Sequence, residues 1–273
     1  MVFVPLKDDA LGRRWQASAV RRPETIDPGI PEIEDTGRLW RRLGRFSALT
    51  NGLLAAAAIA LGLLHPETPL PDHWNPTRPL DLSAPETPLT PWKLARSDEG
   101  AACLAALATG RLAATPLPDL EVSDQCHIRD RVGLTGSDGV ALASVETRCA
   151  TALRLSAWVE YGLEPAARET FGTGIARVHH LSSYNCRRIR TPGGESETMS
   201  THATADAIDV TGVTLDDGRR IDLATDWGDG ERGAFLQSAR DSACRWFGTA
   251  LGPDFNALHA DHFHLQTRGG LCR

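Results

Sequence analysis

The sequence predicts an α+β domain that follows a single transmembrane helix. Two observations support this fold class: helical patterns precede strand-like patterns along the chain, and one long charge-free apolar run lies near the N-terminus. Helices followed by strands are typical of α+β domains, so we expect a small antiparallel sheet with flanking helices. With 273 residues, 41% hydrophobic and 23% charged, the chain is long enough to bury a sizeable core.

The charge balance argues against one class of partner. The formal net charge is −6 and the isoelectric point is near 5.8. Proteins that bind nucleic acid usually carry a strongly basic face. We therefore expect no nucleic-acid partner.

The apolar run covers residues 46–64 and is about long enough, at about 1.5 Å per residue, to cross a hydrocarbon core of about 30 Å. By the positive-inside rule, the arginines before it keep residues 1–45 in the cytoplasm as a disordered tail and send the rest across the inner membrane into the periplasm. These arginines are Arg38, Arg41, Arg42 and Arg45. A cleaved signal peptide and a buried soluble helix are the alternatives to an uncleaved anchor.

All the cysteines follow the apolar run, which agrees with export to an oxidising compartment. They are Cys103, Cys126, Cys149, Cys186, Cys244 and Cys272. Six cysteines indicate three disulfides, with about 15 pairings open. Buried free thiols or zinc thiolates are the alternative, but the sequence has no CxxC pair of the kind that structural zinc sites use.

Composition divides the exported part into two segments. Residues 65–92 are rich in proline and predict a semi-rigid linker with polyproline II character. Residues 93–273 are the predicted folded domain. Its first helix covers residues 99–110 with Gly110 as C-cap, and a second, half-buried helix covers residues 149–163.

The later part of the domain alternates strands with one more helix. Apolar alternation predicts strands at 174–181 and 186–190, then two strands within 207–225 joined by a tight turn. A third helix follows Trp227, with apolar residues from Phe235 to Ala250 at helical spacing and a stop at Gly252 and Pro253. Residues 259–267 predict the last strand.

Histidine and aspartate residues cluster at two places in this domain. His202 and Asp209 are separated by six residues, and His259, Asp261, His262 and His264 lie within six positions downstream. Imidazole nitrogen and carboxylate oxygen are both good Zn²⁺ ligands, and three protein ligands leave a fourth position open. The clustering therefore predicts a zinc site. In a regular strand His262 and His264 would share one face, with Asp261 on the other.

The same residues lie in recognisable motifs. Residues 200–209 (STHATADAID) resemble the SxHxxGxAxD motif of the zinc D-alanyl-D-alanine carboxypeptidases and endopeptidases, the LAS peptidases. Residues 261–265 (DHFHL) are similar to the second motif of that group, and residues 183–187 (SYNCR) resemble its SxYR-like segment. With six cysteines and the ending GPDFNALHADHFH, residues 94–272 resemble more closely the bacterial extensin-like C-terminal domain family.

The resemblance implies a LAS-like fold and a role for each matching residue. It implies that His202, Asp209 and His264 bind Zn²⁺. Ala205 stands where the peptidase motif usually has glycine, so the backbone packing there is expected to differ.

Further roles concern catalysis and substrate. The resemblance implies that Asp261 is the general base and that Arg187 and Ser200 hold a substrate carboxylate or the developing oxyanion. Asp261 also departs from the glutamate that is usual at its position. His259 and His262 are supporting donors or alternative proton carriers.

These residues lead to one functional hypothesis and two alternatives. The hypothesis is a membrane-anchored periplasmic zinc metallopeptidase that hydrolyses amide bonds in peptidoglycan stem peptides or cross-links, with peptidoglycan or cell-wall peptide as its partner. The first alternative is a non-catalytic, zinc-containing module that binds the cell envelope. The second is a structural disulfide domain with incidental histidines. The role of Asp261 distinguishes the enzyme from the binding module.

Overall fold

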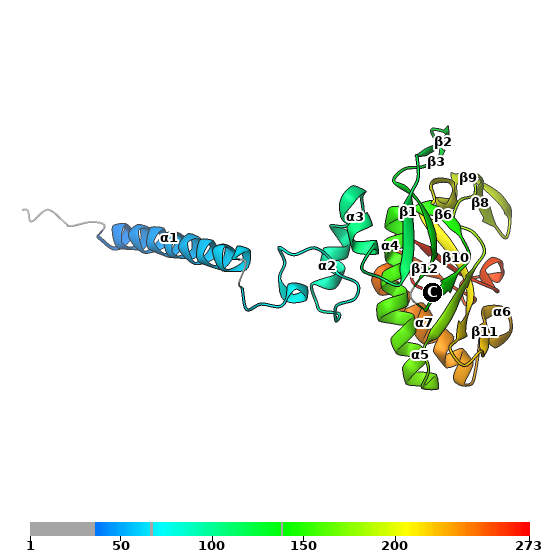
Figure 1. Ribbon diagram of the computed structural model, residues 1–273. Helices are drawn as coiled ribbons and strands as arrows, with labels where there is room; N and C mark the ends of the chain where they lie inside the picture. Colours follow the sequence, from blue (N-terminus) through cyan, green and yellow to red (C-terminus); the bar gives the residue numbers. More distant parts are fainter. Residues whose placement is uncertain (1–35, 66–67, 138) are drawn as a thin grey trace, which may run out of the picture. The chain divides into compact units, whose positions relative to one another are not determined.

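The computed structural model describes residues 36–65, 68–137 and 139–273, so the first 35 residues of the predicted tail lie outside the described residues (Figure 1). Residues 59–273 form one compact unit, distinct from the unit that precedes it. The helical segments are α1 Thr36–Leu64, η1 Asp72–Trp74, α2 Thr90–Ala95, α3 Gly100–Leu107, α4 Cys149–Trp158, η2 Val159–Leu163, α5 Glu164–Phe171, η3 Thr201–Thr204, α6 Leu223–Asp226, α7 Glu231–Trp246 and η4 Ala257–His259.

Thirteen strands are present among the described residues, in two sheets and two separate hairpins. The strands are β1 Leu112–Pro116, β2 Leu120–Ser123, β3 Cys126–Ile128, β4 Arg131–Gly136, β5 Ala141–Leu142, β6 Val145–Arg148, β7 Ile175–His180, β8 Arg188–Thr191, β9 Gly194–Met199, β10 Ala207–Leu215, β11 Arg220–Asp222, β12 Thr249–Leu251 and β13 Phe263–Gln266. The prediction of a mixed α+β protein with small antiparallel sheets is confirmed.

Helix α1 begins earlier than the sequence indicated. It starts at Thr36 rather than at residue 46 and so includes the arginines of the predicted tail. Arginine and leucine are good helix formers, and nothing in this stretch breaks a helix. Within α1, residues 44–64 are long and apolar enough to cross a membrane.

The central sheet holds the strands that position the candidate site. Its order is β12-β13-β10-β7-β5, and β11 folds back after the turn at residues 216–219 to pair antiparallel with the end of β10. All its pairs are antiparallel except the short pair of β5 with β7. Strand β10 lies between β13 and β7, so residues from the second half of the chain meet at its centre.

A second sheet was not predicted from the sequence. Strands β1, β4 and β6 form it, in the order β1-β4-β6, and the hairpin β2–β3 accompanies it. These strands are short, and their apolar alternation is brief, as at Val132 and Leu134 of β4. The apolar alternation was therefore too weak to mark them.

The second helix is longer and more buried than predicted. Segments α4, η2 and α5 run as one continuous helical stretch from Cys149 to Phe171, drawn in green in Figure 1. Helix α4 packs on α3, on α7 and on strands β4 and β6, so every residue in it except Arg154 is buried. Trp158 is central to this core, and its indole N–H donates to the Ala239 carbonyl at 3.0 Å.

Two predicted helix ends differ from the structure. Helix α3 ends at Leu107 with Ala108 as C-cap, and Gly110 is needed for close packing, because a Cβ there would lie 2.6 Å from Ser156 Oγ. Helix α7 ends at Trp246 rather than near residue 252. The chain becomes extended at the next residue and continues into β12, which pairs with β13.

The proline-rich segment belongs to the folded unit over much of its length. Leu80 and Leu82 are buried in the main core, and the Leu82 amide donates to Thr109 Oγ1 at 2.8 Å. The Tyr161 hydroxyl donates to backbone carbonyls of the same segment, including that of Ala84 at 3.0 Å. Residues 65–92 therefore do not form a spacer along their whole length.

Three disulfides form, as predicted, and no cysteine is left free. They join Cys103 to Cys149, Cys126 to Cys186, and Cys244 to Cys272. The second bond ties hairpin β2–β3 to the segment before β8. Cys186 follows Ser183, whose carbonyl contacts His202, by three residues.

Candidate metal centre

His202 is carried by the short 3₁₀ turn η3 and is 2% exposed. Ser200 caps this turn, because its hydroxyl accepts a hydrogen bond from the His202 amide at 3.3 Å. The ring Nδ1–H of His202 donates to the Ser183 carbonyl at 2.7 Å. Since the carbonyl is only an acceptor, this bond sets the tautomer and leaves Nε2 without a proton in the neutral ring.

The turn closes at Ala205, which adopts a left-handed conformation with φ of +50°. Residues other than glycine rarely adopt this conformation, because their Cβ crowds the backbone. The motif that this segment resembles usually has glycine at that position, and the backbone conformation gives the physical reason. Ala205 is fully buried, and its carbonyl accepts from Thr151 Oγ1 at 2.7 Å, so surrounding contacts hold the turn in place.

Asp209 and His264 come from neighbouring strands. They are directly paired in the antiparallel register of β10 with β13, and directly paired residues point to the same face of a sheet. The Nε2–H of His264 donates to Gln266 Oε1 at 3.1 Å, which leaves Nδ1 as the unprotonated nitrogen. The backbone of Asp209 is held by β7 and the residues after it, since its carbonyl accepts from the Leu181 amide at 2.9 Å.

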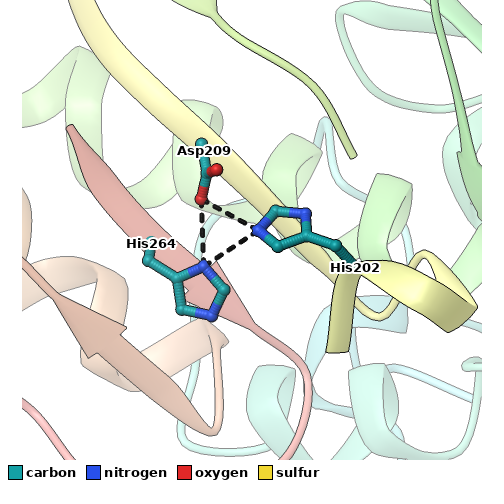
Figure 2. A group of neighbouring side chains, drawn as sticks. All are labelled: His202, Asp209 and His264. Atoms are coloured by element: carbon teal, nitrogen blue, oxygen red, sulfur yellow. Dashed lines mark hydrogen bonds and ion pairs between the residues drawn. The ribbon is translucent and has the colours of Figure 1, made fainter. Parts of the chain in front are cut away.

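The three side chains converge on one point (Figure 2). His202 Nε2 lies 3.2 Å from Asp209 Oδ1 and 3.1 Å from His264 Nδ1, and the last two atoms are 2.9 Å apart. Ligands of a tetrahedral Zn²⁺ at about 2.0 to 2.1 Å lie about 3.3 to 3.4 Å from one another. Two imidazole nitrogens with free lone pairs and one carboxylate oxygen, at nearly this spacing, fit such an ion.

The electrostatics of the triangle agree with a cation site. Burial by itself raises the pKa of Asp209, but when His202 and His264 are protonated toward it their hydrogen bonds and positive charge outweigh burial and hold the pKa well below its usual range. A metal cation bound by the neutral rings would take the place of those protons. Asp209 is therefore an anion at neutral pH. Within the part of the chain that the structure describes, this is the one group of three or more such side chains with metal-ligand spacing.

A family model for the extensin-like protein C-terminus matches residues 101–273, which is more than half of the chain. The chain belongs to the extensin-like C-terminal family. Comparison with curated proteins and comparison with solved structures gave no match. All three atoms of the triangle lie within the matched extensin-like domain.

The Asp261 carboxylate makes no hydrogen bond or ion pair with His202 or His264 in the described part of this extensin-like domain. Strand β13 begins only at Phe263, and the Asp261 side chain is 64% exposed. Its Oδ1 accepts a hydrogen bond from His262 Nδ1 at 2.8 Å. The contact orients His262, whose Nε2 lies 3.8 Å from Asp209 Oδ1. His262 thus lies between the Asp261 carboxylate and Asp209.

His259 lies beside the same triangle. Its ring centroid is 5.8 Å from that of His264 and 5.3 Å from that of His262. Its Nδ1–H donates to Asn256 Oδ1 at 2.8 Å, which fixes the ring. Burial, together with the positive charge of His262, His264 and Arg187, lowers the pKa of His259 to about 4, so it is neutral at neutral pH.

The two predicted substrate residues have different surroundings. The Ser200 hydroxyl is buried and engaged in capping η3, so its contact in the structure is with the backbone of His202. Arg187 is only partly buried and is close enough to His259 to lower the pKa of that ring. Arg187 therefore adds positive charge near His259. Ser200 instead holds the backbone of the turn that carries His202.

Sequence reasoning missed three supporting residues. Ser183, Gln266 and Asn256 each accept a ring N–H from a site histidine, and each thereby fixes the tautomer of that ring. Gln266 follows His264 by two positions on the same strand, so strand periodicity could have identified it. The other two lie in irregular segments and leave no periodic signal.

Proposed function

We propose that this extensin-like protein is a membrane-anchored, periplasm-facing zinc metallopeptidase that hydrolyses amide bonds in peptidoglycan stem peptides or cross-links. The observation that carries the proposal is the triangle of His202 Nε2, Asp209 Oδ1 and His264 Nδ1, with edges of 2.9 to 3.2 Å. Three protein ligands with an open fourth position are typical of catalytic rather than structural zinc sites. The similarity of residues 200–209 and 261–265 to LAS peptidase motifs supports the same chemistry.

Each residue around the triangle has a separate proposed role in amide hydrolysis. Zn²⁺ in such a site polarises a carbonyl and lowers the pKa of water to about 7. His262, with one nitrogen tethered to Asp261 and the other directed toward the triangle, is placed to accept a proton and return it to the leaving amine. Arg187 supplies positive charge for a substrate carboxylate or an oxyanion.

The proposed location rests on the N-terminal apolar helix and on the disulfides of the folded unit. The apolar span at residues 44–64 and the arginines that precede it favour an orientation with the folded unit outside the cytoplasm. The three disulfides are consistent with an oxidising compartment. Both observations support the periplasm, where peptidoglycan is the abundant amide polymer.

The experiment is digestion of purified peptidoglycan by the full-length protein in detergent with Zn²⁺, followed by mass spectrometry of the released products. We expect new muropeptides whose masses differ from the substrate by addition of water across an amide bond. Asp209→Ala should abolish their release, and Asp217→Ala, a change in an exposed turn, should not. The same product pattern from the Asp209→Ala protein would contradict the proposal.

A second candidate function rests on the position of Asp261. Its carboxylate is exposed and makes no ion pair with His202 or His264. If the site lacks a group that transfers a proton effectively, the protein would bind envelope peptide without cutting it. In that case the zinc-loaded protein would sediment with peptidoglycan and release no muropeptide. Co-sedimentation without product thus distinguishes the binding module from the enzyme.

A further inference from the structure

A second polar pocket lies outside the metal triangle. It has a volume of about 260 Å³ and is built from segments far apart in the sequence. Hairpin β2–β3, the end of β6, the end of η3 and the segment after β13 all contribute to it. Its lining residues are His127, Arg129, Arg148, Thr204, Asp206 and Arg268.

Asp206 organises two of the arginines in this pocket. Its side chain is 4% exposed, its Oδ1 accepts from Arg148 Nη1 at 3.0 Å, and its Oδ2 accepts from Arg268 Nη2 at 2.8 Å. Thr204 Oγ1 also donates to Oδ2 at 2.7 Å. A single buried carboxylate thus holds two guanidinium groups side by side at the wall of the pocket.

Two polar groups of this wall are not fully hydrogen-bonded within the protein. Among the described residues, the buried atoms Arg148 Nε and His127 Nδ1 have no hydrogen-bond partner. Buried polar groups are rarely left unpaired, because losing water without gaining a new partner is unfavourable. The third guanidinium, that of Arg129, is 63% exposed at the rim.

The positive charge of the lining residues favours a negatively charged ligand. The lining residues carry three guanidinium groups and one carboxylate, a formal excess of two positive charges. Just outside the lining, Glu121 pairs with Arg129 at 3.5 Å and Glu99 pairs with Arg148 at 3.3 Å. Both glutamates are largely exposed, so an entering anion competes with ion pairs that solvent weakens. Guanidinium groups bind carboxylate and phosphate through paired N–H donors.

We propose that this pocket is a second ligand site, separate from the metal triangle, that binds an oxyanion through Arg129, Arg148 and Arg268. The ligand is a carboxylate or a phosphate group on a small molecule or at the end of a larger one. The site does not depend on the proposed peptidase activity. It lies at the far end of the η3 turn that carries His202, because Thr204 ends that turn and contacts Asp206.

The test measures anion binding to the full-length protein in detergent after treatment with a chelator, so that a metal cannot contribute. Isothermal titration calorimetry is carried out with inorganic phosphate and, separately, with glutarate. We expect saturable one-to-one binding that weakens as NaCl is raised. Tighter binding of phosphate identifies a phosphate-bearing ligand, and tighter binding of glutarate identifies a carboxylate-bearing one.

Variants assign the binding to this pocket. Arg129→Gln should weaken binding by about tenfold or more, since a hydrogen bond to a charged group is lost at an exposed position that is not needed for folding. Arg220→Gln is the matched control, because that arginine is also exposed and paired with a carboxylate, and it should have no effect. His264→Ala should also leave binding unchanged.

Two results would overturn the proposal. One is the absence of saturable binding for both anions. The other is a binding pattern that places the anion at another site. Binding that is unchanged in Arg129→Gln, or binding that is lost in His264→Ala, would each show this. Circular dichroism of each variant checks that its fold is intact.

Discussion

Asp209 on β10 and His264 on β13 are cross-strand partners, and their facing atoms Oδ1 and Nδ1 lie 2.9 Å apart. The pairing depends on the register of the two strands. A shift by one residue would send one of the two side chains to the opposite face of the sheet. The antiparallel sheet therefore does more than support the site, because its register brings together ligands 55 positions apart in the sequence.

Gln266 should tune metal affinity without binding the metal itself. Its Oε1 accepts the Nε2–H of His264 and also the hydroxyl of Thr201, so it orients one ligand and contacts the turn that carries another. We expect Gln266→Ala to weaken zinc binding by about 10- to 100-fold. Competition against a chromophoric chelator measures the affinity.

The matched control for this change is Gln237→Ala. Gln237 is an exposed residue of α7 whose amide donates to the Gly228 carbonyl. The control should bind zinc as the wild type does. Equal affinities for the Gln266 variant and the wild type would show that His264 needs no such partner.

His262 and Asp261 should differ in their effects on hydrolysis. His262→Ala removes a ring whose Nε2 lies 3.8 Å from Asp209 Oδ1 and should lower kcat by about 10²- to 10⁴-fold. Asp261→Ala leaves the ring in place and removes its tether, so the loss should be smaller, about tenfold. Muropeptide release under saturating substrate measures both, and zinc content should stay unchanged in each variant. A complete loss with Asp261→Ala and a mild one with His262→Ala would reverse the two roles.

Glu164 should make stability depend on pH. Burial by itself raises the pKa of its carboxyl, but the Ile175 amide, Arg111 and Arg168 outweigh this and hold the pKa below its usual range. The ionised carboxylate therefore contributes stability above the unfolded-state pKa of about 4.3, and this contribution is lost as the pH falls through the lower folded-state pKa. Glu164→Gln should cost about 1–2 kcal/mol at pH 7.

Urea unfolding of the two proteins between pH 7 and pH 3 measures this effect. The difference in unfolding free energy should narrow toward low pH, because the wild type then loses the contribution that the variant already lacks. Glu169→Gln is the control, since Glu169 lies exposed in the same helix. A difference that stays constant over this pH range would contradict the assignment.

Sequence patterns predicted strands β7, β10, β11 and β13 of the central sheet, but not β5, β12 or the sheet of β1, β4 and β6. Strand β10 has nine residues with strong apolar alternation, whereas β5 and β12 have two and three residues and are too short to show a period. The π-helical stretch η2, which joins α4 to α5, has no signature in a hydrophobic pattern. The burial of Leu80 and Leu82 was also hidden, because prolines around them suggested an extended linker.

The grouping of His202, Asp209 and His264 could be predicted, because residue types and spacing of this kind are typical of metal sites. The orientation of Asp261 could not be settled in the same way. Strand alternation gave a reason for it to point away from His264, but the strand begins only at Phe263, so a turn conformation decides its direction. The hydrogen bond from His262 to Asp261 depends on that turn conformation, and no sequence pattern indicates it.

The most direct test of the metal centre is the zinc content of the purified full-length protein, measured by inductively coupled plasma mass spectrometry. We expect one zinc per chain in the wild type, and in the control His179→Ala, whose ring contacts Thr214 instead. His202→Ala, Asp209→Ala and His264→Ala should each lose the zinc while keeping the disulfide-bonded fold. Wild-type protein that binds no zinc, or the three variants retaining one zinc per chain, would contradict the account.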